Sequence, residues 1–66
     1  MKIFVQDRRT NAFLANDARW VRQLDYARVF TTSLEALHFC TGRNLTHMDV
    51  LVCYSGHQSN LRLPLC

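Results

Sequence analysis

The sequence predicts a small α+β fold, with one helix packed on one face of a four- or five-stranded, mainly antiparallel sheet. Short β-prone segments separated by turn residues lie on both sides of one amphipathic segment that carries helix-capping residues. The expected order is two or three strands, one helix and two strands. Short connections between consecutive strands favour antiparallel pairing. Residues 1–66 are expected to form a single domain, because so short a chain has no room for two.

An N-terminal hairpin is expected first. Residues 2–6 are rich in β-branched and aromatic side chains, which favour a strand. Residues 7–11 are polar and include turn formers, so the chain should reverse there. Residues 12–15 would then form the returning strand, and 18–21 a third short strand with Trp20 as its apolar anchor.

The connection to the helix leaves two alternatives open at each of its steps. Residues 23–28 fit either a single helical turn or a loop. Val29 and Phe30 are β-prone, and they fit a short strand or an extended entry to the helix.

The helix is expected at about residues 33–41. Thr32 and Glu35 form a capping-box pattern, in which each side chain accepts a hydrogen bond from the other residue's backbone N–H. Gly42 stands where a left-handed residue ends many helices. At about 100° per residue, the apolar side chains share one face of this helix. They are Leu34, Ala36, Leu37 and Cys40.

Two C-terminal strands complete the predicted sheet. Residues 49–54 contain the most continuous apolar run, which favours an interior strand. Residues 55–60 are turn formers, and 61–63 alternate between apolar and polar side chains. Pro64 has no N–H to donate, so this last strand is expected at a sheet edge.

The predicted core combines the apolar side chains of the helix and of the sheet face beneath it. Its members are Ile3, Val5, Phe13, Trp20, Phe30, Leu34, Leu37, Cys40, Val50, Val52 and Leu63. A single helix leaves the other sheet face uncovered, and a homodimer would cover its apolar side chains. The candidates for that face are Phe4, Leu51, Tyr54, Leu61 and Leu65.

Membrane-spanning and exported proteins are not expected. No apolar run approaches the roughly 20 residues that cross a bilayer. The apolar stretch at residues 3–5 is far shorter than the about 7–15 residues at the centre of a signal peptide. We therefore expect a cytoplasmic protein whose three cysteines, Cys40, Cys53 and Cys66, are reduced.

The chain combines a hairpin, Trp20-Val21, the step Ala27-x-x-Phe30 into a helix, and a closing Arg62-Leu63-Pro64-Leu65 strand. In these features it resembles a group of short, uncharacterised bacterial proteins of unknown function. The resemblance covers nearly the whole chain, but its residues are packing residues. It implies a compact bacterial domain and no particular active site.

Metal binding and catalysis are not favoured by the residue spacing, and no cofactor is expected. Cys53 and His57 are four positions apart, but the close cysteine pair typical of structural zinc sites is absent. Cys53 with His57, or Cys66 with a histidine, could in principle form a nucleophilic pair. We expect no enzyme, because one helix and a small sheet leave little volume for a pocket of several hundred Å³.

Two functions remain. The favoured one is a non-enzymatic protein-interaction or regulatory module, with self-association as one form of it. Such a module needs no catalytic residues, and it fits a small domain with surplus apolar surface. The alternative is a weak nucleic-acid-binding domain that uses arginines around the first hairpin, with aromatic side chains to stack on bases. The arginines of that alternative are Arg8, Arg9, Arg19 and Arg22.

Overall fold

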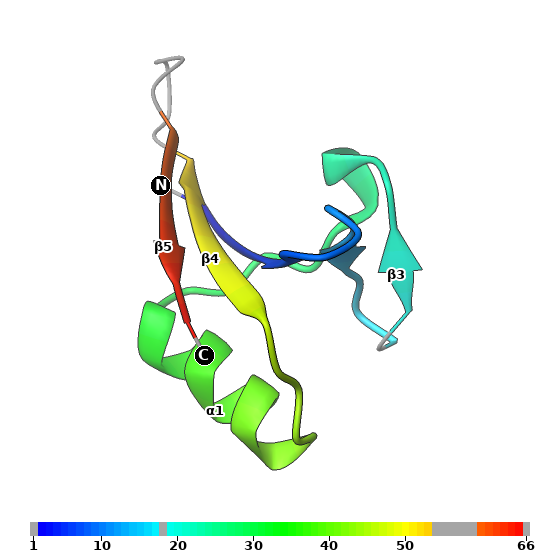
Figure 1. Ribbon diagram of the computed structural model, residues 1–66. Coiled ribbons are helices and arrows are strands. Elements are labelled where there is room, and N and C mark those ends of the chain that lie inside the picture. Colours follow the sequence, from blue (N-terminus) through cyan, green and yellow to red (C-terminus); the bar gives the residue numbers. More distant parts are fainter. Residues whose placement is uncertain (1, 18, 54–59, 66) are drawn as a thin grey trace.

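One antiparallel sheet organises the computed structural model, which describes residues 2–17, 19–53 and 60–65. Within these residues, five strands follow the order β3-β2-β1-β4-β5, and every neighbouring pair is antiparallel (Figure 1). The predicted α+β class and element order are confirmed. The elements are β1 Lys2–Asp7, β2 Phe13–Leu14, β3 Trp20–Val21, the 3₁₀ turn η1 Leu24–Tyr26, α1 Ser33–Gly42, β4 Met48–Cys53 and β5 Asn60–Pro64.

The first strand of the chain lies in the middle of this sheet. β1 pairs with β4 along its whole length, from Lys2 opposite Cys53 to Asp7 opposite Met48. Its other edge pairs with β2, and β4 in turn lies between β1 and β5. The interior strand predicted from the apolar run at 49–54 is therefore confirmed, one residue earlier along the chain.

The first hairpin closes through backbone and side-chain hydrogen bonds. The Asp7 N–H donates to the Ala12 carbonyl over 2.8 Å. The Asp7 carboxylate accepts the Arg9 N–H, also over 2.8 Å, as aspartate commonly does in turns. Asn11 adopts a left-handed φ of 63°, which asparagine tolerates better than most residues. The predicted reversal at residues 7–11 is confirmed.

The connection from β3 to the helix lies beside the part of β1 that β2 leaves unpaired. Its first part is the single turn η1, one of the two alternatives that the sequence leaves open. The Arg28 N–H then donates to the Leu14 carbonyl over 2.8 Å, and the Phe30 N–H to the Ile3 carbonyl over 2.7 Å. Phe30 thus forms one bridge beside β1 just before the helix begins.

The start of α1 keeps half of the predicted capping box. The Thr32 hydroxyl accepts the Glu35 N–H over 3.1 Å, as expected. The Glu35 carboxylate does not return to the Thr32 backbone, because the Thr31 hydroxyl donates to it over 2.8 Å. No helix in the described residues is long and apolar enough to cross a membrane.

The end of α1 differs from the prediction. Gly42 is the last helical residue, and the left-handed position is Asn44, with a φ of 56°. The Leu45 N–H donates to the Cys40 carbonyl over 2.9 Å, and the Asn44 N–H to the Thr41 carbonyl over 3.2 Å. These are the two bonds of a Schellman motif, in which asparagine can replace the usual glycine.

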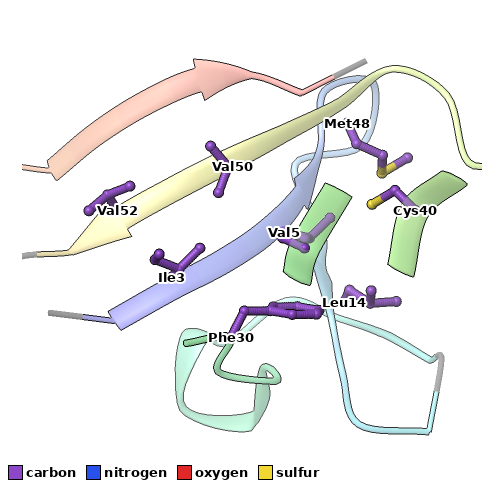
Figure 2. Close-up of a cluster of buried hydrophobic side chains, with 9 residues drawn as sticks. Ile3, Val5, Leu14, Phe30, Cys40, Met48, Val50 and Val52 are labelled. Carbon is purple, nitrogen blue, oxygen red and sulfur yellow. The ribbon is translucent and has the colours of Figure 1, made fainter. Parts of the chain in front are cut away.

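A buried apolar cluster joins the helix, the segment before it and three strands. Figure 2 shows the Cys40 and Met48 side chains pointing toward one another, with Phe30 beneath Val5. Phe39, Leu45 and Leu65 pack against the cluster from outside. The buried members are Ile3, Val5, Leu14, Phe30, Ala36, Cys40, Met48, Val50 and Val52.

Five predicted core residues lie outside this cluster. Phe13 and Leu37 are half-buried, whereas Trp20, Leu34 and Leu63 are exposed. The helix turns Ala36 and Cys40 toward the sheet, and such small side chains allow a close approach. The centre of the core is then filled by Phe30 from the connection and by Leu14 and Met48 from the strands.

An arginine sits between the two phenylalanines that link this connection to the helix. The Arg28 guanidinium carbon lies 4.7 Å from the Phe30 ring centre and 4.9 Å from that of Phe39. The two rings meet edge to face at 5.9 Å. Each such cation–π contact stabilises by about 0.5–2 kcal/mol, so Arg28 acts as part of the packing.

The face of the sheet away from the helix is less exposed than the sequence predicts. Phe4 is buried and Leu51 is half-buried. Leu61 lies on the helix face instead, opposite Val52, and Leu65 packs against the core cluster. Tyr54, the remaining candidate for this face, lies outside the described residues.

A buried carboxylate on this face joins three parts of the chain. Asp49 accepts a hydrogen bond from Arg8 Nε over 3.0 Å and from Arg62 Nε over 2.7 Å. Its side chain is 7% exposed, while each arginine side chain is 43% exposed. Asp49 stands between Gln6 and Pro64 in the sheet, so it ties the first turn and the edge strand to β4.

We predict that Asp49→Ala lowers the free energy of unfolding by about 2 kcal/mol, because both charged hydrogen bonds are lost. The loss stays below the about 3–5 kcal/mol typical of a fully buried pair, since the half-exposed arginines regain water. The control is Asp17→Ala, which removes an exposed pair with Arg19 and should change stability by less than about 0.5 kcal/mol. Urea unfolding followed by circular dichroism measures both, and equal effects would contradict the assignment.

Gly42→Ala is predicted to stabilise the protein by about 0.5–1 kcal/mol, because Gly42 is helical and alanine is the better helix former. A β-carbon placed there meets nothing within 4 Å. The thermal midpoint of unfolding should therefore rise. A fall would mean that Gly42 occupies the left-handed position after all, and that Asn44 does not.

Candidate functional site

An open hollow lies beside the edge strand β3. Figure 1 shows this strand at the end of the molecule away from α1. Its volume is about 430 Å³. Three stretches of chain form its wall: the turn after β2, β3 itself and η1. The lining side chains include Ala15, Asp17, Arg19, Trp20, Val21 and Tyr26.

Two aromatic side chains on this wall remain largely in solvent. Trp20 is 40% exposed and Tyr26 is 67% exposed. By register, Trp20 lies opposite Leu14, on the side of the sheet where the core forms. It stands in the edge strand, however, and α1 covers the opposite end of the sheet (Figure 1). Tertiary arrangement therefore converts a predicted core residue into part of a surface hollow.

The charges around the hollow nearly balance. Arg19 Nε lies 2.6 Å from Asp17 Oδ2, and both side chains are more than half exposed. Asp25, on the neighbouring η1, is also exposed. Such exposed pairs contribute little to stability, and the two aromatic rings are the largest side chains on the wall.

The four arginines of the nucleic-acid alternative have different surroundings. Arg8 holds the buried Asp49, and Arg9 Nε lies 3.7 Å from the Asp7 carboxylate. Arg19 is paired within the hollow. Arg22 follows β3 and is exposed, with no ion pair among the described residues. Three of these four arginines thus lie beside an aspartate, and one of those aspartates, Asp49, is shared with Arg62. The four residues are Arg8, Arg9, Arg19 and Arg22.

The candidate metal and thiol residues can be placed only in part. Cys40 is buried in the core, and Cys53 is half-buried at the end of β4; the two do not form a disulfide with each other. His57 and Cys66 lie outside the described residues, so the pairings proposed for them are not placed. Across the described stretches, no group of three histidine, cysteine, aspartate or glutamate side chains converges as metal ligands would.

Sequence reasoning did not identify the hollow, and it expected too little volume for one. A signal was available in residues 22–26, where Tyr26 ends a segment with few other apolar side chains.

Comparison with known proteins assigns no relative to this chain. No family model matches it, and no curated protein or solved structure is significantly similar to it. The resemblance to short bacterial proteins therefore stays a prediction, and the function must be argued from the geometry.

We predict that Trp20→Ala costs only about 1 kcal/mol of stability, because the ring is partly exposed and lies at the sheet edge. Phe30→Ala, which empties the centre of the core, should cost about 3–5 kcal/mol. Urea unfolding followed by far-UV circular dichroism compares the two variants. A Trp20→Ala loss as large as that of Phe30→Ala would place the indole in the core and remove the hollow.

Proposed function

We propose that the protein is a non-enzymatic protein-interaction module and that the hollow beside β3 holds an apolar side chain of its partner. The observation that carries this proposal is the pair of exposed rings, Trp20 and Tyr26, on the wall of a single hollow.

The composition of the hollow supports protein recognition. Tryptophan, tyrosine and arginine are the residue types most enriched among binding hot spots, where they surround pockets filled by a partner's side chain. Trp20, Tyr26 and Arg19 supply all three types on the same wall. Its volume lies within the roughly 300–1,000 Å³ of ligand sites.

The nucleic-acid alternative is supported by Arg22, which is exposed and follows the same strand as Trp20. Base stacking on exposed rings could contribute about 1–3 kcal/mol per base. Phosphate binding, however, needs several cations close together. Because Asp7, Asp17 and Asp49 each pair with an arginine of this region, we favour a protein partner.

We place the activity in the cytoplasm. Cys40 packs as a small apolar side chain in the core, and Cys53 is also unbridged, which suits a reducing compartment. A bacterial origin is proposed on the resemblance alone.

Selection from a random peptide library displayed on phage tests the proposal. The full chain is the target, and the Trp20→Ala, Tyr26→Ala double variant removes peptides that bind elsewhere. We expect peptides with one aromatic or large aliphatic anchor and micromolar affinity, lost at least about tenfold in the double variant because both aromatic rings of the wall are gone. Leu34→Ala is the matched control, since it truncates an exposed apolar side chain on the helix and should leave peptide affinity unchanged.

Titration with labelled random-sequence single-stranded DNA and RNA, at about 50 and 200 mM salt, decides between the two functions. Anisotropy should report no binding tighter than about 100 µM at the lower salt. Two results together would replace the proposal by the nucleic-acid function. The first is tight binding that weakens steeply with salt and is lost in an Arg19→Ala, Arg22→Ala variant. The second is the absence of any peptide specific for the hollow.

A further inference from the structure

The pairing of β5 with β4 fixes which backbone groups of β5 face away from the sheet. The Leu65 N–H donates to the Met48 carbonyl over 2.9 Å, and these residues continue the register that places Leu63 opposite Val50. Hydrogen-bonded pairs alternate along an antiparallel ladder. The N–H and carbonyl groups of residues 61, 63 and 65 therefore face β4, and those of 60, 62 and 64 face away from the sheet.

Pro64 occupies one of the outward positions. Its missing N–H therefore costs the β4–β5 ladder nothing, which is where proline is tolerated in a sheet. The outer edge still presents the N–H groups of Asn60 and Arg62 and the carbonyls of residues 60, 62 and 64. β5 is the terminal strand on this side of the sheet, so among the described strands none pairs with these groups.

We infer that β5 pairs with β5 of a second copy of this chain, antiparallel, about a two-fold axis at Arg62. In this register the Arg62 N–H of each copy donates to the Arg62 carbonyl of the other. The Asn60 N–H of each copy donates to the Pro64 carbonyl of the other. Every outward N–H of the strand then has an acceptor, and both prolines lie at the ends of the paired stretch, where the missing donors disturb it least.

The side chains on the helix face fit the same register. Leu61 lies opposite Leu63 of the partner subunit, and Leu63 opposite the partner's Leu61. Both leucines are 44% exposed in the single chain, although they stand beside the core residues Val52 and Val50. Pairing extends the apolar surface of the core across the two-fold axis, and cross-strand apolar contacts are the main stabilising unit of such sheets.

Charge on the opposite face limits the strength of the pairing. Arg62 faces Arg62 of the partner subunit, and like charges directly opposite one another are unfavourable. Each Arg62 is bound to its own Asp49 over 2.7 Å, which offsets part of this repulsion. Because Asp49 also serves Arg8, a net positive charge remains on each side. Added salt should therefore tighten the dimer by screening the repulsion.

A foreign strand is the less favoured occupant. It would meet the same missing donor at Pro64, and its own side chains would have to match both the leucines and Arg62. A second copy places a leucine against each leucine and both prolines at the ends of the paired stretch, because an isologous contact repeats the same residues on both sides. The Arg62 pair is the one position of this register that is not complementary. A contact through one five-residue strand is expected to bury less than the roughly 1,200–2,000 Å² of stable interfaces, so we expect dissociation constants in the high micromolar range.

Amide hydrogen exchange against protein concentration tests the pairing directly. From about 10 µM to about 1 mM of the full chain, sedimentation should show a dimer forming, more strongly at higher salt. The Arg62 amide should exchange rapidly at low concentration and several-fold more slowly at high concentration. The Leu63 amide serves as the internal control, since it bonds to β4 in both states and should not change.

Two variants change the dimer in opposite directions. Leu61→Lys places a charge against the partner's leucine and should weaken dimerisation at least about tenfold. The matched control is Val29→Lys, which changes an exposed apolar side chain on the other side of β1 from β5 and should leave dimerisation unchanged. Pro64→Ala adds an outward N–H to each copy, and two more hydrogen bonds per dimer should tighten association about tenfold.

A chain that stays monomeric at about 1 mM overturns the inference. So does a dimer in which the Arg62 amide gains no protection, or one that Pro64→Ala leaves unchanged. These measurements are independent of Trp20, in the opposite edge strand β3, and of Tyr26, in η1, so failure here and failure of the proposed peptide binding are distinguishable.

Discussion

The hydrogen bonds from Arg8 and Arg62 to the buried Asp49 carboxylate hold the sheet together on the face that has no helix. A carboxylate at this depth is tolerated only when it is paired, so Asp49 requires both the first turn and the edge strand to be in place. The hydrogen bond from Arg62 to Asp49 also holds β5 beside β4, so the Arg62 side chain is bound within its own chain. The same contact therefore sets which groups of β5 are left for a neighbour.

A small domain has few apolar side chains with which to fill its core, and on the helix face most of the buried volume does not come from the helix. The helix turns only the small side chains of Ala36 and Cys40 into the core. The bulk comes from Phe30, which enters from the connection and is bracketed by Arg28 and the Phe39 ring. Because the helix is short and covers one end of the sheet, β3 at the other end is left with exposed rings.

The two surfaces considered for binding lie at opposite edges of the sheet. The hollow belongs to β3 and the self-pairing edge to β5, with β2, β1 and β4 between them. Neither surface needs the other's residues, so a dimer through β5 would present two hollows facing away from the contact. Two linked sites raise the apparent affinity for a partner that itself has two binding segments, without any new contact.

The sequence by itself determined the element order, the helix near residues 33–41, the edge position of the Pro64 strand and the place of Cys40 in the core. Each of these depends on local chemistry: a capping threonine, a residue without an N–H, or the period of the apolar side chains. It did not determine which face of the helix is buried, the left-handed Asn44, the pairing of Asp49 or the exposure of Trp20. Those were decided by the tertiary structure, because each depends on which distant segments pack together. Phe30 is buried whereas Trp20 and Leu34 are exposed, and two arginines far apart in sequence meet one carboxylate.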